Sequence, residues 1–140
     1  MDLPFSTEEL ARLYRFALLL TGDEAASQQV LHDSCVDCSG RLGSYRNSES
    51  RLACIIGVIR QKARARPAGE AHGVGRALEV LPEEERSALA GLYCGLLPAR
   101  ALAEAMKMSL DQLGRVLKSA RERLDPDLRV STEPDLEKTA

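Results

Sequence analysis

Polar side chains between Ser109 and Leu124 repeat at a spacing that places them on one side of a helix. Guanidinium and ammonium groups on such a face can bind backbone phosphates, whereas an amide and a hydroxyl can form hydrogen bonds with base edges. The pattern therefore fits contact with DNA, although many helical hairpins present a solvated face of the same kind. The side chains concerned are Gln112, Arg115, Lys118 and Ser119.

The other side of this segment is apolar and is expected to be buried. Ser109 and Gln112 also have the spacing of a capping box, which predicts that the helix begins at this point. Gln112 is therefore predicted both to help start the helix and to face solvent. The apolar stripe consists of Leu110, Leu113, Leu117, Ala120 and Leu124.

Two further helices are expected just before this one. Pro82 occupies a favoured first position, and the glutamates at 83–85 complement the positive end of the helix dipole. We expect Gly95 to end that helix, Pro98 to begin the next, and residues 107–108 to form the turn before the last helix. Two helices joined by a tight turn are the layout of a helix-turn-helix, which can lay one helix in the major groove.

Three amphipathic helices are expected in the N-terminal half. Ser6 and Glu9 have capping-box spacing at the start of the first helix, and Thr21 and Glu24 repeat that spacing before the second. The third helix is expected to begin near Asn47 or Ser48. The predicted inward positions are Leu10, Leu13, Tyr14, Ala17 and Leu18 in the first helix, Val30, Leu31, Ser34, Cys35 and Cys38 in the second, and Leu52, Ile55, Ile56, Ile59 and Ala63 in the third.

Composition narrows the class of protein. Of 140 residues, 44% are apolar and 4% aromatic, so the cores must be built from Leu, Ala, Ile and Val. The chain has no strand pattern and no apolar run of about 18 residues that could span a membrane. Its acidic N-terminus lacks the basic and apolar parts of a secretory signal. We therefore expect an all-α cytoplasmic protein without membrane insertion.

The chain is expected to divide into two helical domains. Residues 1–66 should form an N-terminal helical bundle and residues 81–124 a C-terminal helix-turn-helix domain. Between them, residues 67–80 contain the glycines and proline of a linker. Residues 125–140 form a polar, acidic tail that we expect to be disordered.

Basic side chains are concentrated in two blocks, although the net charge is −2. Residues 41–66 contain seven basic and one acidic side chain, and residues 99–124 contain six and three. Two basic blocks in an acidic chain suggest two local contacts with anions rather than a general coat for polyanions. Solvated helix faces are the alternative for each block.

The spacing of His32, Cys35 and Cys38 permits two interpretations. Ligands three residues apart on a helix can share a zinc ion, but both cysteines fall on the predicted apolar face and are better explained as buried thiols. Cys54 and Cys94 also lie on apolar faces, and scattered thiols suit a reducing cytosol. We predict no metal and no other cofactor. Without a glycine-rich phosphate loop or a catalytic constellation, an enzyme is not expected.

Four segments carry a resemblance to a known family: LPEEERSALAGLYCGL (81–96), ARALAEAMKMSLDQLGRVLKSARERL (99–124), LYRFALLLTGDEAASQQVLHDSCVDCSGRL (13–42) and ESRLACIIGVIRQKARAR (49–66). They resemble sigma-70 family factors, particularly the small two-domain extracytoplasmic-function (ECF) group. The two C-terminal segments resemble region 4 of that family, residues 13–42 resemble region 2, and residues 49–66 resemble the segment after it. The resemblance covers roughly residues 10–124 and implies a sigma region 2-like bundle followed by a sigma region 4-like helix-turn-helix.

That resemblance implies two kinds of contact. Core RNA polymerase and double-stranded promoter DNA are the expected partners, with the opened −10 strand and an anti-sigma factor as further candidates. The implied DNA-binding residues are Ser109, Gln112, Arg115, Lys118 and Arg121 in the last helix and Arg60 and Arg64 in the N-terminal half. The implied polymerase-binding residues are Gln29, His32 and Asp33.

The chain departs from the family pattern at several contact positions. Gly114 and Val116 stand where a lysine and an arginine are usual, Gln29 replaces an acid and Arg51 replaces an aromatic residue. Two functions are therefore predicted. The first is an ECF-like sigma factor that directs transcription initiation. The alternative is a non-initiating mimic or adaptor that acts through protein contacts with an anti-sigma factor or polymerase.

Overall fold

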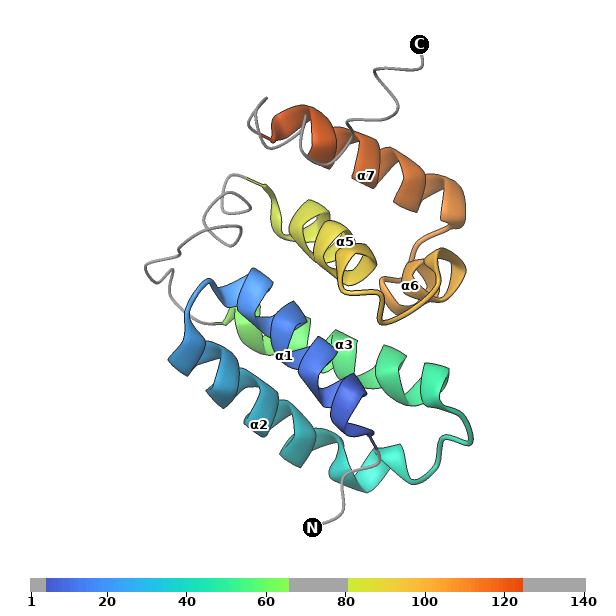
Figure 1. Ribbon diagram of the computed structural model, residues 1–140. Helices are drawn as coiled ribbons and strands as arrows, with labels where there is room; N and C mark the ends of the chain where they lie inside the picture. The colour runs from blue at the N-terminus through green and yellow to red at the C-terminus, as the bar shows by residue number, and fades with distance from the viewer. Residues whose placement is uncertain (1–4, 66–80, 125–140) are drawn as a thin grey trace.

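The computed structural model describes residues 5–65 and 81–124, and every regular element in this part of the chain is a helix. The predicted all-α class is therefore confirmed for these residues. The predicted linker at 67–80 and tail at 125–140 lie outside them. The six helices, shown in Figure 1, are α1 (Thr7–Thr21), α2 (Glu24–Leu42), α3 (Ser48–Arg64), α5 (Glu83–Tyr93), α6 (Ala99–Ala105) and α7 (Leu110–Arg123).

The start of α1 agrees with the prediction, whereas the start of α2 does not. Ser6 caps α1 in a full capping box with Glu9. The N-cap of α2 is Asp23, whose carboxylate accepts the backbone N–H of residue 26 at 2.7 Å. The predicted Thr21–Glu24 box is wrong because Thr21 is itself the last residue of α1, whose C-cap Gly22 adopts a left-handed conformation. The N-cap of α2 is therefore two residues after the predicted position.

Helices α1, α2 and α3 pack together around an aliphatic core. Helix α3 begins at Ser48, within the predicted range, and Asn47 caps it with its side-chain oxygen 2.8 Å from the backbone nitrogen of Ser50. The predicted inward faces are confirmed: every one of their positions is buried or half-buried. The core residues with no exposed surface include Leu13, Ala17, Cys38, Ile55, Ile56 and Ile59.

The C-terminal helices follow the predicted turns closely. Gly95 has a positive φ of 64° after α5, and Lys107 has a φ of 60° between α6 and α7. Pro82 is the N-cap of α5 rather than its first residue, a difference of one position. Helix α7 begins at the predicted capping box of Ser109 and Gln112. The order of helix, tight turn and second helix is therefore present from α6 to α7.

The predicted apolar stripe of α7 is correct except at its first position. Leu113, Leu117, Ala120 and Leu124 are buried, but Leu110 is 55% exposed. It is the first residue of the helix, one turn before Leu113, and the rest of the fold does not cover the stripe that far. The periodicity predicted the direction in which the side chain points, but it could not predict where the covering surface ends.

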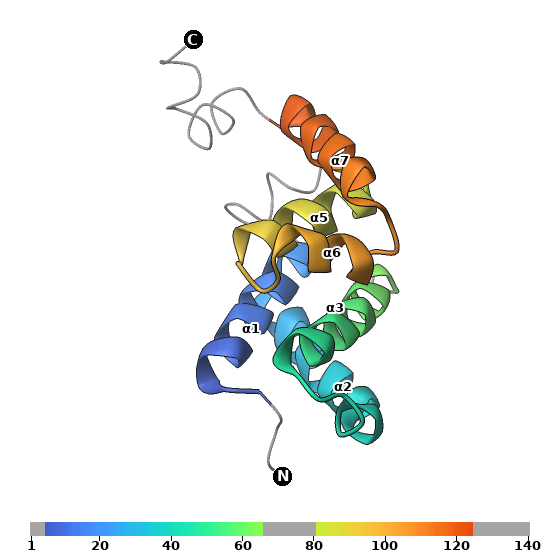
Figure 2. The same ribbon diagram turned by 90° about the vertical axis from the view of Figure 1, so that its right-hand side faces the viewer.

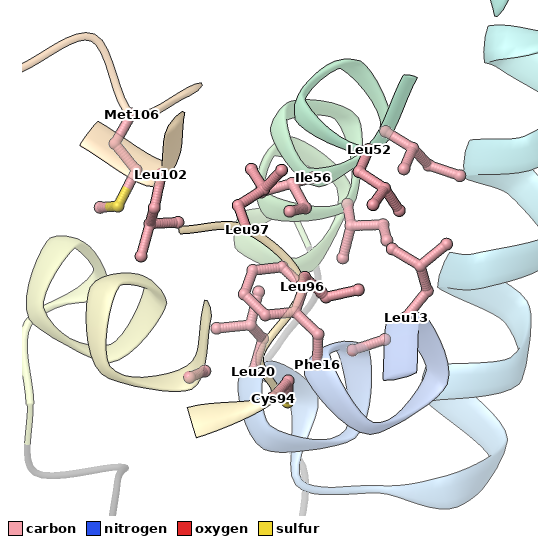
Figure 3. Close-up of a cluster of buried hydrophobic side chains, with 14 of the residues drawn as sticks. Leu13, Phe16, Leu20, Leu52, Ile56, Cys94, Leu96, Leu97, Leu102 and Met106 are labelled. Atoms are coloured by element: carbon pink, nitrogen blue, oxygen red, sulfur yellow. The ribbon is translucent and has the colours of Figure 1, made fainter. Parts of the chain in front are cut away.

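The two halves of the described chain share one continuous core. Leu96 and Leu97, just after α5, lie between α1 and α3, where they meet Phe16, Leu20 and Ile56 (Figure 3). Helix α5 packs beside α1, and α6 packs beside α3. The predicted N-terminal and C-terminal segments therefore pack directly against each other in this structure.

Polar contacts reinforce this packing. The guanidinium of Arg12 on α1 donates to the carbonyl oxygen of Gly95 at 3.2 Å. In the opposite direction, Arg86 on α5 donates to the carbonyl oxygen of Leu20 at 3.4 Å.

Helices α2 and α7 lie at opposite ends of the molecule in both views (Figures 1 and 2). Their outer faces are consequently separate surfaces.

Candidate nucleic-acid interface

The outer face of α7 presents two cations to solvent. Arg115 and Lys118 are exposed on the side opposite the buried Leu113, Leu117 and Ala120. Within residues 5–65 and 81–124, neither cation has an ion-pair partner. Both charges are therefore available to an external anion, as the sequence predicted.

Ser109 and Gln112, also predicted to contact DNA, use their side-chain oxygens within the protein. Ser109 Oγ accepts the backbone N–H of Gln112 at 3.1 Å, and Gln112 Oε1 accepts the backbone N–H of Ser109 at 2.8 Å. An amide that reads adenine needs both its oxygen and its nitrogen. Gln112 Oε1 already accepts one hydrogen bond, which directs its amide toward the start of α7, so the structure gives these residues a positioning role there.

The remaining positions of this face differ in exposure. Arg121 is half-buried and already has partners within the protein. Val116 is half-buried and packs against the core. Gly114 is exposed, and a Cβ built there would have no neighbour within 4 Å. The cationic face is therefore narrow, with Arg115 and Lys118 at its centre and an empty position at Gly114.

Arg60 and Arg64, the other predicted DNA contacts, both lie beside Glu83 of α5. Arg60 Nε and a terminal guanidinium nitrogen donate to the two carboxylate oxygens of Glu83 at 3.0 and 3.1 Å. A terminal nitrogen of Arg64 lies 4.0 Å from the same carboxylate. The Arg60 side chain is only 14% exposed, and that of Arg64 is 55% exposed. The structure thus brings these two arginines together around an internal anion.

Glu83 is held in its charged form by its neighbours. Partial burial raises the pKa of its carboxyl group, but hydrogen bonds from Arg60 and Ser87, together with the charges of Arg60 and Arg64, outweigh that effect and leave the pKa below its ordinary value. Ser87 Oγ donates to Glu83 Oε1 at 2.8 Å. The acidic run at 83–85 was predicted only to complement the helix dipole, so this ion pair was missed.

Other cations of the block at 41–66 also have internal partners. Lys62 Nζ lies 2.6 Å from the Asp37 carboxylate on α2. Arg51 donates to the backbone oxygen of Tyr45 at 3.2 Å and to Ser48 Oγ at 3.4 Å. These hydrogen bonds stabilise the turn before α3. Much of the positive charge in this block therefore stabilises the fold.

The three predicted polymerase-binding residues gather on the outer side of α2. Gln29 Nε2 donates to Asp33 Oδ1 at 2.8 Å, and His32 Nδ1 lies 3.5 Å from the same oxygen. The hydrogen bond from Gln29 is the main reason that the pKa of Asp33 is lowered. Val36, one turn beyond His32, is 52% exposed although it is apolar. This face combines polar groups with an exposed aliphatic side chain.

The cysteines are buried or half-buried in the core, as predicted. Cys35 and Cys38 are buried, whereas the His32 side chain is 73% exposed, so the three do not converge. Burial, followed by the neighbouring Cys54, raises the pKa of Cys38 to about 11. The sulfurs of Cys38 and Cys54 are 4.0 Å apart. Among the described residues, no three side chains of the His, Cys, Asp and Glu types are placed to share a metal ion.

A second acidic residue of α5 is also paired. Glu85 is buried, and its carboxylate oxygen lies 3.2 Å from Arg123 Nε on α7. No spacing rule connects either Glu83 or Glu85 to its partner, because each pair joins different helices.

No helix in the described part of the chain is both long enough and apolar enough to cross a membrane.

Comparisons with family models, with curated proteins and with solved structures each found no match. The likeness to sigma factors therefore rests on the register of residues in this chain.

Proposed function

We propose that the protein is a DNA-binding transcription protein of sigma-like design, with α7 as the helix that enters the major groove. The observation that carries this proposal is the pair of exposed cations, Arg115 and Lys118, on a helix that follows a tight turn. The aliphatic stripe beneath them fixes α7 against α5 and α6. The side chains proposed to face the groove therefore lie on a helix whose position is fixed by its contacts with α5 and α6.

The proposed binding is dominated by phosphate contacts. Arg115 and Lys118 lie three residues apart and project to the same side, which suits two phosphates along one groove edge. The Ser109–Gln112 cap fixes the start of α7, whose first backbone N–H groups favour an anion. Base reading is a smaller contribution, because Gln112 Oε1 already accepts a hydrogen bond.

We further propose that the outer face of α2 docks on core RNA polymerase. Gln29, His32 and Asp33 form a connected polar group, and Val36 adds exposed apolar surface beside it. Helix α2 lies at the opposite end of the molecule from α7 (Figure 2). Both surfaces can therefore be occupied at once, as a factor that joins polymerase to DNA requires.

The DNA proposal is tested by fluorescence anisotropy with a labelled duplex of mixed sequence over a range of salt concentrations. The double variant Arg115→Ala/Lys118→Ala should bind more weakly, with a salt slope reduced by roughly 2, since about one counterion is released for each phosphate contact. The matched control is Arg100→Ala/Lys107→Asn, which removes two exposed cations elsewhere. Asn is chosen because it tolerates the positive φ of position 107. Equal loss in both double variants would contradict a specific role for α7.

The polymerase proposal is tested by pull-down with core enzyme. Gln29→Ala/His32→Ala removes two members of the polar group and should weaken capture, whereas Arg100→Ala on α6 should not. In vitro transcription on genomic fragments then separates an initiating factor from a binder. Capture that does not change in the α2 variant would reject this face as the docking surface.

One observation favours the alternative, a non-initiating mimic or adaptor. Arg60 is paired with Glu83 and largely covered, so fewer cations face solvent than the sequence suggests. An adaptor that binds through helix faces should be nearly insensitive to salt, in contrast to a DNA-bound factor. Strong capture of polymerase without any salt-dependent DNA binding would therefore select the adaptor.

A further inference from the structure

We propose that Glu83 is an internal competitor for nucleic-acid phosphate at Arg60 and Arg64. This inference rests on the proposed function and concerns how its DNA contact is regulated. In the arrangement described, the carboxylate occupies the position that a phosphate would take, and the two arginines bind DNA only when Glu83 moves away.

The geometry of the pair supports competition. Two guanidinium nitrogens of Arg60 bind the two carboxylate oxygens at 3.0 and 3.1 Å, which is the forked geometry that arginine also uses for phosphate. The second cation, Arg64, lies 4.0 Å from the same group. Both guanidinium groups are therefore already directed at the Glu83 carboxylate when a phosphate approaches.

The Glu83 carboxylate is held in place by side chains of two helices. Ser87, one helical turn later and 1% exposed, donates to Glu83 Oε1 at 2.8 Å. The carboxylate thus receives hydrogen bonds from two elements, α3 and α5. Because the Arg60 side chain is 14% exposed and the Glu83 side chain 31% exposed, the acid is the more accessible partner. A phosphate in contact with Arg60 would have to displace it.

The contact also links the competition to the packing of the two halves. Glu83 begins α5, while Arg60 and Arg64 lie in the last turns of α3. Release of Glu83 removes an ion pair between these helices but leaves the apolar contacts of Leu96 and Leu97 in place. DNA binding at α3 should therefore loosen the start of α5 without unfolding the shared core.

The test compares Glu83→Gln with Glu84→Gln. Both substitutions remove one negative charge, but Glu84 is exposed and has no ion-pair partner within the described ranges. On a labelled duplex of mixed sequence, E83Q should bind several-fold more tightly than E84Q, with a salt slope steeper by roughly 1 to 2. Arg60→Gln and Arg64→Gln combined with E83Q should abolish that gain. Equal affinities of E83Q and E84Q would overturn the proposal.

A second variant tests the proposal even if E83Q does not fold. Ser87→Ala keeps every charge and removes only the hydroxyl that holds Glu83, so it should raise DNA affinity in the same direction by a smaller factor. Circular dichroism checks that each variant is folded. If E83Q binds no more tightly than E84Q and S87A binds no more tightly than wild type, the competitor role is rejected.

The outcomes separate this inference from the proposed function. Duplex binding that is lost in Arg115→Ala/Lys118→Ala but equal in E83Q and E84Q rejects the competitor and supports α7. Tighter binding by E83Q that is unaffected by the α7 double variant supports the competitor and rejects the role of α7. Binding by none of the proteins rejects both.

Discussion

Gly91 of α5 lies directly against Leu102 of α6, so that a Cβ built on Gly91 would stand 2.8 Å from Leu102 Cδ1. Leu102 has no exposed surface and is enclosed by the core, so it cannot move without displacing its neighbours. The absence of a side chain at position 91 therefore sets how closely the two helices approach. This contact supports the short α6 and, through it, the turn that leads to α7.

Gly91→Ala should destabilise the protein although alanine is the better helix former. We expect a loss of roughly 1 to 3 kcal/mol in the free energy of unfolding, the usual cost of overpacking. Urea denaturation followed by circular dichroism measures it. An unchanged or higher midpoint would show that Leu102 can move aside freely.

Gly114→Ala should have the opposite effect. Position 114 lies inside α7 and is exposed, and a Cβ added there would meet no atom beyond the neighbouring backbone of its own helix within 4 Å. The substitution should therefore stabilise the protein by about 0.5 to 1 kcal/mol, because glycine is the poorer helix former. The same denaturation experiment serves both glycines. A destabilised Gly114→Ala protein would mean that α7 needs flexibility at this point.

Helix ends could be predicted from the sequence because they depend on neighbouring residues. The caps at Ser6, Asn47 and Ser109 and the turn at Gly95 use side chains or backbone conformations within a few positions. The exception is Thr21, which had the right spacing for a cap but is itself the last residue of α1. A local rule predicts a cap only where the preceding helix has already ended.

The packing of the two halves was not predicted, although α1 contained a signal for it. The predicted face of α1 left out Phe16, Leu19 and Leu20, which are all buried. Together with the predicted face they make the end of α1 apolar on nearly every side, which is typical of a helix covered by more than one partner. The sequence could not identify that partner, because Leu96 and Leu97 lie far along the chain.

The candidate site was predictable only where it depends on one helix. The periodicity of α7 correctly placed Arg115 and Lys118 on its outer face. By contrast, the pairing of Arg60 with Glu83 depends on how α3 meets α5, which no residue spacing encodes. The basic block therefore looked more available to DNA in the sequence than it is in the structure.

Leu97→Ala should weaken both halves of the molecule. Leu97 is 5% exposed between α1 and α3, so we expect a loss of roughly 2 to 5 kcal/mol from the cavity and the lost burial. Amide hydrogen exchange should accelerate in α1 and α3 as well as in α5. Leu110→Ala, at a 55% exposed position, is the control and should change stability little. Exchange that accelerates only in α5 to α7 would mean that the halves fold independently.

Cys38 and Cys94 should react slowly with alkylating agents near neutral pH. Burial is the main cause that raises the pKa of each thiol to about 11 from an ordinary value of 9.0. Because the thiolate is the reacting species, ionisation alone should slow iodoacetamide roughly a hundredfold relative to the unfolded chain. Mass spectrometry of the alkylated peptides measures the rates, with urea-unfolded protein as the reference. Equal rates in the folded and unfolded protein would contradict the burial of these thiols.

Acid should selectively weaken the contact between Glu83 and Arg60. The pKa of Glu83 is lowered in the folded protein relative to its ordinary value of 4.5, so the pair contributes stability above that value. That contribution is lost as the pH falls through the folded-state pKa, where the carboxylate becomes protonated. Urea midpoints of wild type and Glu83→Gln should therefore differ at neutral pH and converge in acid. Glu84→Gln controls for the removal of one charge, and a difference between wild type and Glu83→Gln that persists in acid would show that the ionised carboxylate is not what stabilises the contact.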